Sequence, residues 1–176
     1  HDWPISRQIV WGIRIPVWYN IDRNASNLWV WWLDKNKKLH QDNVRKFLDQ
    51  EVKLEEIEAG LQKVSALPKP SGPDYVISQS KPGNDYLPET DTFDTWFSSG
   101  QWPLITLNYP DGDDFKKYYP TDVMGTLAEI ITFWISRMVM FGLYLTKQIP
   151  FRTVYLWSMV IDAQGQKMSK SRGNVV

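Results

Sequence analysis

The sequence predicts an α/β protein made of two parts, a small mixed β/α module followed by a unit built on a parallel sheet. Three observations predict this: alternating apolar residues near the start, a helical period in residues 41–64, and a strand–helix–strand order near the end. A proline-rich stretch separates the two parts. We therefore expect a module over residues 1–64, a linker over 65–90 and an α/β unit over 91–176.

Residues 5–33 predict three short strands. Segments 5–12 and 13–19 alternate in polarity and meet at Gly12, and Pro16 favours an edge position for the second. A turn-rich stretch follows over residues 20–27. Leu28–Leu33 is dense in aromatic side chains and predicts the third strand.

Residues 41–64 predict an amphipathic surface helix, interrupted near Val52, because apolar residues recur at three- and four-residue steps. Asp42 or Asn43 can cap its start. Residues 65–90 then hold five of the eleven prolines, which exclude a helix there. We expect that stretch to be a connection.

Residues 91–176 predict a strand, a helix and a second strand. The first strand ends at Asp122–Gly125, and a long apolar helix follows over Leu127–Leu145 with Thr126 as its candidate cap. Thr153–Ile161 is an almost continuous apolar run, as expected for a strand buried on both faces. This order predicts a right-handed parallel crossover.

Composition limits the classes of function open to this chain of 176 residues. Lys and Arg number 20, as do Asp and Glu, so the formal net charge is zero, which argues against a surface wholly devoted to nucleic acid. The absence of cysteine excludes disulfides, thiolate zinc sites and cysteine nucleophiles. Because no unbroken run of about 18 apolar residues and no signal peptide is present, we expect a cytoplasmic protein without a transmembrane helix.

The densest chemical signal is the segment Gly165–Asn174, where Lys167, Lys170 and Arg172 alternate with small residues. It follows the last predicted strand, and ligands of open α/β sheets bind outside the carboxyl ends of strands. One turn would bring the two lysine ammonium groups to one side, where they could stabilise a leaving pyrophosphate. A solvated basic turn is the alternative interpretation. The spacing excludes a P-loop.

Lys167–Ser171 reads KMSKS, and on this signature the chain resembles the class I aminoacyl-tRNA synthetases. Further blocks resemble the valyl members of that family, or the group of valyl, isoleucyl and leucyl enzymes: Asp2–Gln8 with Trp11–Gly12 and Arg14–Pro16, Asp94–Gly100 with Trp102–Pro103, Tyr119–Val123, Phe133–Trp134 with Arg137–Met138, and Pro150–Val154. The resemblance covers residues 2–19 and about 86–176, and residues 20–85 match weakly.

This resemblance implies a fold and a function. The C-terminal unit would be the second half of a Rossmann-type catalytic domain, and the N-terminal module would be the return from the editing insertion. The parent protein would be a valine–tRNA ligase that activates valine with ATP and transfers it to tRNA(Val). ATP with Mg²⁺, valine, tRNA(Val) and the remaining domains of the parent are the implied ligands and partners, with no zinc and no membrane. The chain alone would be inactive, because it lacks the His-x-Gly-His segment that activation also requires.

The resemblance also implies site residues. Lys167 and Lys170 match the catalytic lysines that stabilise the phosphates. The implied ATP-binding residues are Met159, Val160, Lys167, Met168, Ser169, Lys170 and Glu129. Trp96 and Ile130 match residues that wall the valine side-chain pocket, although an isolated Trp or Ile is usually core packing.

Two departures from the valyl pattern keep alternatives open. Leu127–Glu129 stands where the family has Gly, an aromatic residue and Asp, and Trp157–Ser158 stands where it has His-Gly. These departures favour a non-catalytic RNA- or protein-binding module derived from a synthetase. An isoleucyl or leucyl enzyme is a second alternative, disfavoured by the residues at Thr95–Gly100. A purely structural α/β domain leaves the ordered blocks unexplained.

Overall fold

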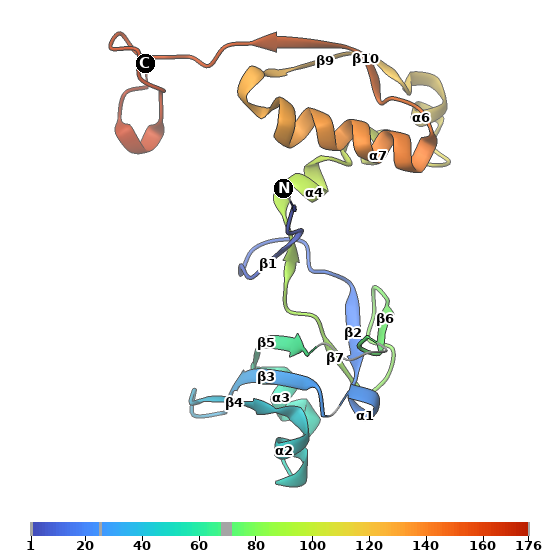
Figure 1. Cartoon of the computed structure of the whole chain (residues 1–176), viewed down its shortest axis with the longest axis vertical. Coiled ribbons are helices and arrows are strands. Elements are labelled where there is room, and N and C mark those ends of the chain that lie inside the picture. The colour runs from blue at the N-terminus through green and yellow to red at the C-terminus, as the bar shows by residue number, and fades with distance from the viewer. Residues whose placement is uncertain (1, 25, 68–71, 176) are drawn as a thin grey trace. The chain divides into compact units, whose positions relative to one another are not determined.

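The structure is a computed structural model that describes residues 2–24, 26–67 and 72–175, and it has a mixed α/β architecture (Figure 1). The chain divides into two compact units, unit 1 over His1–Asp94 and unit 2 over Thr95–Val176. The sequence placed the division in a linker over 65–90, whereas the strands within that stretch belong to unit 1. Residues 68–71 of the predicted linker lie outside the described residues.

Unit 1 consists of short helices and small antiparallel sheets with the strand orders β1–β8, β6–β2–β7 and β4–β3–β5. Its elements are β1 (Ser6–Arg7), β2 (Val17–Asn20), α1 (Ile21–Asn24), β3 (Leu28–Leu33), β4 (Leu39–Asn43), α2 (Val44–Asp49), α3 (Leu54–Gly60), β5 (Leu61–Ala66), β6 (Tyr75–Ile77), β7 (Tyr86–Pro88) and β8 (Thr92–Phe93).

The core of unit 1 lies between the β4–β3–β5 sheet and helices α2 and α3. Alternation along β3 buries Leu28, Val30 and Trp32 on one face, as a period of two requires. Phe47 from α2 and Ile57 from α3 pack in the same cluster. Each large apolar side chain buried in this way contributes about 1.5–3 kcal/mol, so the sheet and its helices stabilise each other.

The helix predicted over residues 41–64 is two helices flanked by two strands. The Asn43 side chain accepts a hydrogen bond from the Arg45 backbone N–H, 2.9 Å away, which confirms the predicted cap of α2. The break near Val52 is also confirmed, since α2 ends at Asp49 and α3 begins at Leu54.

The last four residues of that prediction, 61–64, are wrong as helix because they begin strand β5. Val64 lies buried opposite Val30 in the sheet register, so pairing with β3 outweighs the helical period. Gly60 permits the change of direction, because a Cβ there would overlap the carbonyl oxygen of Leu33.

The first predicted strands are shorter than expected, and the proline-rich stretch contains strands of its own. β1 covers Ser6–Arg7 and β2 covers Val17–Asn20. β6 and β7 pair with the two edges of β2, so that Trp18 lies opposite both Val76 and Pro88. β2 is the central strand of its sheet, so the predicted edge position is wrong. Pro16 lies just before β2, outside the paired strand, so its missing N–H does not interrupt the pairing.

Over its described residues, 95–175, unit 2 combines helices with a parallel pair of strands, β9 and β10. Its elements are α4 (Thr95–Ser99), α5 (Trp102–Ile105), α6 (Asp113–Tyr118), β9 (Thr121–Leu127), the 3₁₀ turn η1 (Ala128–Ile130), the π-helical segment η2 (Ile131–Ile135), α7 (Ser136–Thr146), β10 (Phe151–Trp157) and the 3₁₀ turn η3 (Lys170–Arg172).

The predicted strand–helix–strand order of unit 2 is confirmed. β9 and β10 run parallel, with helix α7 between them in the chain and beside them in space (Figure 1). Met124 of β9, Ile135 of η2, Met138 of α7 and Phe151 of β10 form one buried cluster. The apolar stripe of the helix therefore packs on the parallel pair.

Two expectations for this unit are wrong. Thr126 lies buried within β9 and caps nothing, because the strand runs on to Leu127 and the helical segment starts without a side-chain cap. β10 is not buried on both faces, since only Phe151 of its seven residues is fully buried. Within the described residues the pair has no third strand, and the helix covers one face.

Candidate functional site

A hollow of about 530 Å³ lies at the carboxyl end of the parallel pair. The end of β9, the start of the long helical segment, the end of β10 and the following loop all contribute to it. The residues lining it are Gly125, Thr126, Leu127, Ile130, Trp134, Trp157, Met159, Val160, Lys167 and Met168. This is the edge of an α/β sheet at which ligands bind.

Part of the lining of this hollow comes from the closely packed strands β9 and β10. A Cβ added at Gly125 would come within 2.8 Å of the Trp157 ring, so only glycine lets that indole lie across the neighbouring strand. On the helical side, the Trp134 indole N–H donates to the Ser99 carbonyl oxygen at 2.9 Å, which fixes the ring against the end of α4. The π-helical segment η2 carries Trp134, and such segments are frequent at functional sites.

The cationic loop after β10 is closed by backbone hydrogen bonds. Asp162 N–H donates to the Gln166 carbonyl oxygen at 2.8 Å, and Ile161 forms a β-bridge with Lys167. Gly165 turns the chain between them with a positive φ of 75°. The loop thus returns to the end of β10, and this return places Lys167 at the rim of the hollow.

The two predicted catalytic lysines lie in different local structures. Lys167 belongs to the β-bridge, Ser169 has an extended backbone, and Lys170 begins the 3₁₀ turn η3. The expectation that one turn joins the lysines is therefore wrong, because the extended residues between them interrupt the helical geometry. Both lysine side chains are exposed, and only Lys167 lines the hollow.

Side-chain hydrogen bonds concentrate at Asp162 and Asn174. The Asn174 amide donates to Asp162 Oδ2 at 2.7 Å, and the backbone N–H groups of Gln164 and Gln166 donate to Asp162 Oδ1. These bonds, the one from Asn174 foremost, hold the pKa of the Asp162 carboxyl below its ordinary value of 3.8. Asp162 therefore stays ionised at neutral pH and keeps accepting.

The predicted ATP-binding residues fall into two groups. Met159, Val160, Lys167 and Met168 come together around the hollow, and the Met168 N–H donates to the Val160 carbonyl oxygen at 3.4 Å. The others do not line it: Ser169 and Lys170 lie further along the loop, with the Ser169 hydroxyl 2.6 Å from that of Ser171. Glu129 is exposed in η1.

The two predicted valine-pocket residues lie on different elements, Ile130 on η1 and Trp96 on α4. Ile130 lines the hollow beside Trp134. Trp96 in α4 stacks on Phe133 of η2, with ring centroids 5.7 Å apart and planes at 29°, and it is half-buried. A contact of either residue with valine stays a prediction.

Sequence reasoning missed half of the hollow. Gly125, Thr126 and Trp134 line it without having been linked to the ATP or valine sites. Leu127 and Trp157 also line it, and they were noted only within the two departures from the valyl pattern near the ATP site. Their place at the carboxyl ends of two predicted parallel strands, or at the start of the helix between them, is the signal that could have found them.

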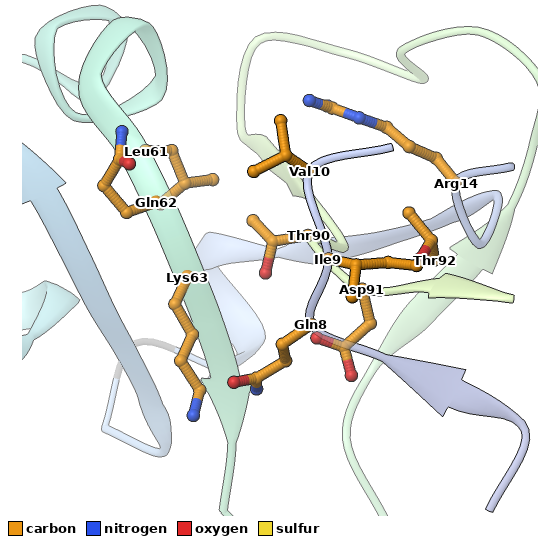
Figure 2. Close-up of a pocket in the computed structure, with 10 residues that line it drawn as sticks. All are labelled: Gln8, Ile9, Val10, Arg14, Leu61, Gln62, Lys63, Thr90, Asp91 and Thr92. Carbon is orange, nitrogen blue, oxygen red and sulfur yellow. The ribbon is translucent and has the colours of Figure 1, made fainter. Parts of the chain in front are cut away.

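A second hollow, of about 340 Å³, lies in unit 1 (Figure 2). Its lining comes from the segment of residues 8–14, from β5 and from residues 90–92. It combines the cations of Arg14 and Lys63 with the carboxylate of Asp91, and the Lys63 ammonium lies 5.1 Å from the centroid of the Trp31 ring. This mixture of charges selects no single class of ligand.

Metal ligands do not gather in the described parts of the chain. Over residues 2–24, 26–67 and 72–175, no group of three or more His, Asp or Glu side chains is placed to hold a metal ion. The lining of the hollow beside the cationic loop also contains no carboxylate.

One helical segment, Ala128–Thr146, is long and apolar enough to cross a membrane by length and composition alone. The core helix of a soluble protein passes the same test, so the finding is weak evidence for a membrane. The sequence predicted this segment as the long apolar helix over Leu127–Leu145, and it contains no unbroken apolar run of the length used there to predict a membrane span. Its Ile135 and Met138 pack against the parallel pair. The expected absence of a membrane span stays a prediction.

Comparison with known proteins decides the family. The model of the class I tRNA synthetases for isoleucine, leucine, methionine and valine matches residues 1–176. The chain belongs to the class I tRNA synthetases. Among its relatives, it is 38% identical over 177 residues to a valine–tRNA ligase of Coxiella burnetii and 40% identical over 174 residues to one of Borreliella burgdorferi. It is also 39% identical over 183 residues to a valine–tRNA ligase of Schizosaccharomyces pombe.

These alignments cover almost all of the chain and a small part of each relative. They include 99%, 98% and 99% of this synthetase chain, in the same order, and 15% of each relative. The resemblance inferred from the KMSKS segment and the ordered blocks is thereby confirmed. The matched portion includes residues 20–85, which sequence reasoning matched only weakly.

Proposed function

We propose that this chain is part of a valine–tRNA ligase and forms the second half of a Rossmann-type catalytic domain. The observation that carries the proposal is the position of Lys167, which lines the hollow at the carboxyl end of the parallel pair. A cation at that edge suits a nucleotide phosphate. The relatives named valine–tRNA ligase support the choice of amino acid.

In the proposed reaction, a carboxylate oxygen of valine attacks the α-phosphorus of ATP. The bond between the α-phosphorus and the oxygen that bridges to the β-phosphate breaks, and pyrophosphate leaves with the bonding electron pair. Lys167 and Lys170 offset the charge that grows on this leaving group. A hydroxyl oxygen of the terminal ribose of tRNA(Val) then attacks the carbonyl carbon of valyl-adenylate. The bond between that carbon and the phosphate oxygen breaks, AMP leaves with the bonding electron pair, and the hydroxyl proton is released.

In this proposal, other residues of the chain contact the adenine and the valine side chain. Met159, Val160 and Met168 provide an apolar wall with backbone polar groups for adenine, and Ile130 with Trp96 limits the valine side chain. The hollow offers Mg²⁺ no carboxylate ligand, so no step here is assigned to the ion. We further propose that the remaining domains of the parent cover the exposed strand β10, because parallel strands are normally covered on both faces.

A non-catalytic, synthetase-derived module is the second candidate, and the Trp157 ring is the observation that favours it. This indole lies across Gly125 in the lining of the hollow, where the resemblance leads us to expect the imidazole of a His-Gly pair. Such a module would keep the fold and bind RNA or protein without activating an amino acid.

Amino-acid-dependent exchange between ATP and labelled pyrophosphate, measured on the full-length protein, distinguishes the candidates. The proposal predicts exchange with valine that exceeds exchange with isoleucine or leucine, and no exchange by the 176-residue chain alone. Preference for isoleucine or leucine would assign the parent to another member of the family. Absence of exchange with all three amino acids would favour the non-catalytic module.

A further inference from the structure

A hydrogen bond between two side chains, one neutral and one anionic, holds the cationic loop together. Asp162 follows the end of β10 closely and Asn174 lies twelve positions later, and the Asn174 amide donates to Asp162 Oδ2 at 2.7 Å. Both residues are half-buried, whereas most of the loop around them is exposed. We call this pair the Asp162–Asn174 clamp.

Both side chains of the clamp also form hydrogen bonds with backbone groups of the loop. Asn174 Oδ1 accepts from the Ser169 N–H at 2.9 Å, and Asn174 Nδ2 donates to the Lys167 carbonyl oxygen at 3.2 Å, so this side chain spans Met168. Asp162 Oδ1 accepts from the N–H groups of Gln164 and Gln166 at 3.0 and 2.8 Å. The clamp therefore fixes the backbone on both sides of Lys167.

The sequence around the clamp allows the chain to reach it. Gly165 has a φ of 75° and Gly173 a φ of 67°, conformations that glycine adopts without strain. Gly173 ends η3, with its N–H donating to the Lys170 carbonyl oxygen at 3.2 Å, and it brings Asn174 back beneath the loop. The flexible lysine side chains thus start from a fixed backbone.

We propose that Asp162 and Asn174 are positioning residues for the activation reaction, holding the loop so that Lys167 stays at the rim of the hollow. This proposal rests on the function proposed above. Neither residue needs to touch the substrates, because both act through the backbone that carries the lysines. A misplacement of about 1 Å can lower a reaction rate by about 10²-fold, so a loosened loop has a measurable effect.

The test uses the full-length protein with Asp162→Ala and Asn174→Ala, and with Gln164→Ala as matched control, since Gln164 gives the clamp only its backbone N–H. We expect kcat for valine-dependent pyrophosphate exchange to fall about 10- to 100-fold in the two clamp variants, with little change in the KM for valine. The control keeps the wild-type kcat. Trypsin should also cut faster after Lys167, Lys170 and Arg172 in the clamp variants.

A reversed pair separates positioning from general damage. Asn174→Asp alone places two carboxylates together and lowers kcat, whereas Asp162→Asn combined with Asn174→Asp restores a donor–acceptor contact and recovers part of it. Wild-type kcat in both alanine variants of an active protein would overturn this proposal alone. A wild-type protein without valine-dependent exchange would overturn the proposed function, and this proposal with it.

Discussion

The antiparallel β4–β3–β5 sheet of unit 1 and the parallel pair of unit 2 differ in how completely their apolar side chains are covered. In unit 1, β3 buries Leu28, Val30 and Trp32 beneath two helices. In unit 2, only Phe151 of β10 is fully buried, and Trp157 at its end is 47% exposed. The functional candidates all lie in the less covered unit, so the chemistry proposed here depends on surfaces that this chain alone leaves open.

The largest effect expected from this difference comes from substitutions in the buried cores of the two units. Leu28→Ala removes a fully buried side chain of unit 1, and we expect it to lower the free energy of local opening by about 2–5 kcal/mol. Met138→Ala in α7 should cost nearer the lower end of that range, because its partly exposed neighbours can relax into the space.

Hydrogen exchange of the full-length protein measures both changes, read at the amides of β3 and of α7. Each substitution should accelerate exchange in its own unit. Acceleration of α7 amides by Leu28→Ala, to the same extent as those of β3, would show that the two units do not open independently.

A smaller effect concerns the wall of the proposed valine pocket. Trp96→Ala removes a stacked ring pair with Phe133, an interaction worth about 0.5–1.5 kcal/mol beyond the area that it buries. We expect a several-fold weaker binding of valine to the full-length protein and a reduced preference over isoleucine, measured by equilibrium binding and by pyrophosphate exchange. Trp11→Ala is the control, because that indole in unit 1 is 91% exposed. Unchanged selectivity would assign Trp96 to packing alone.

Local signals in the sequence predicted part of the fold well. The aromatic run at Leu28–Leu33, the Asn43 cap and the strand before the long helix were found because neighbours in the chain determine them. Strand β5 was missed because Leu61 and Val64 fit a helical period as well as a strand. β5 pairs with β3, which lies far from it in the sequence, and this pairing favours a strand over a helix.

The candidate site shows the same division. The charges and glycines of Gly165–Asn174 marked the loop, and its place after a strand marked the edge of the sheet. The role of Gly125 in the hollow could not be predicted from the sequence, because its lack of a Cβ matters only once parallel pairing brings Trp157 across it. The exposure of β10 was also not predicted. An apolar run indicates that a strand is covered, but it does not indicate which segment of the protein covers it.

The most direct test of the account is the rate of valyl-adenylate formation in the full-length protein with Lys167→Ala or Lys170→Ala. Loss of one donor that stabilises developing charge typically costs about 2.7–4 kcal/mol, so each variant should be slower by about 10²–10³-fold while valine binding changes little. Lys147→Ala, which removes an exposed lysine at the end of α7, should retain the wild-type rate. Wild-type rates in both loop variants would contradict the claim that these ammonium groups stabilise the departing pyrophosphate.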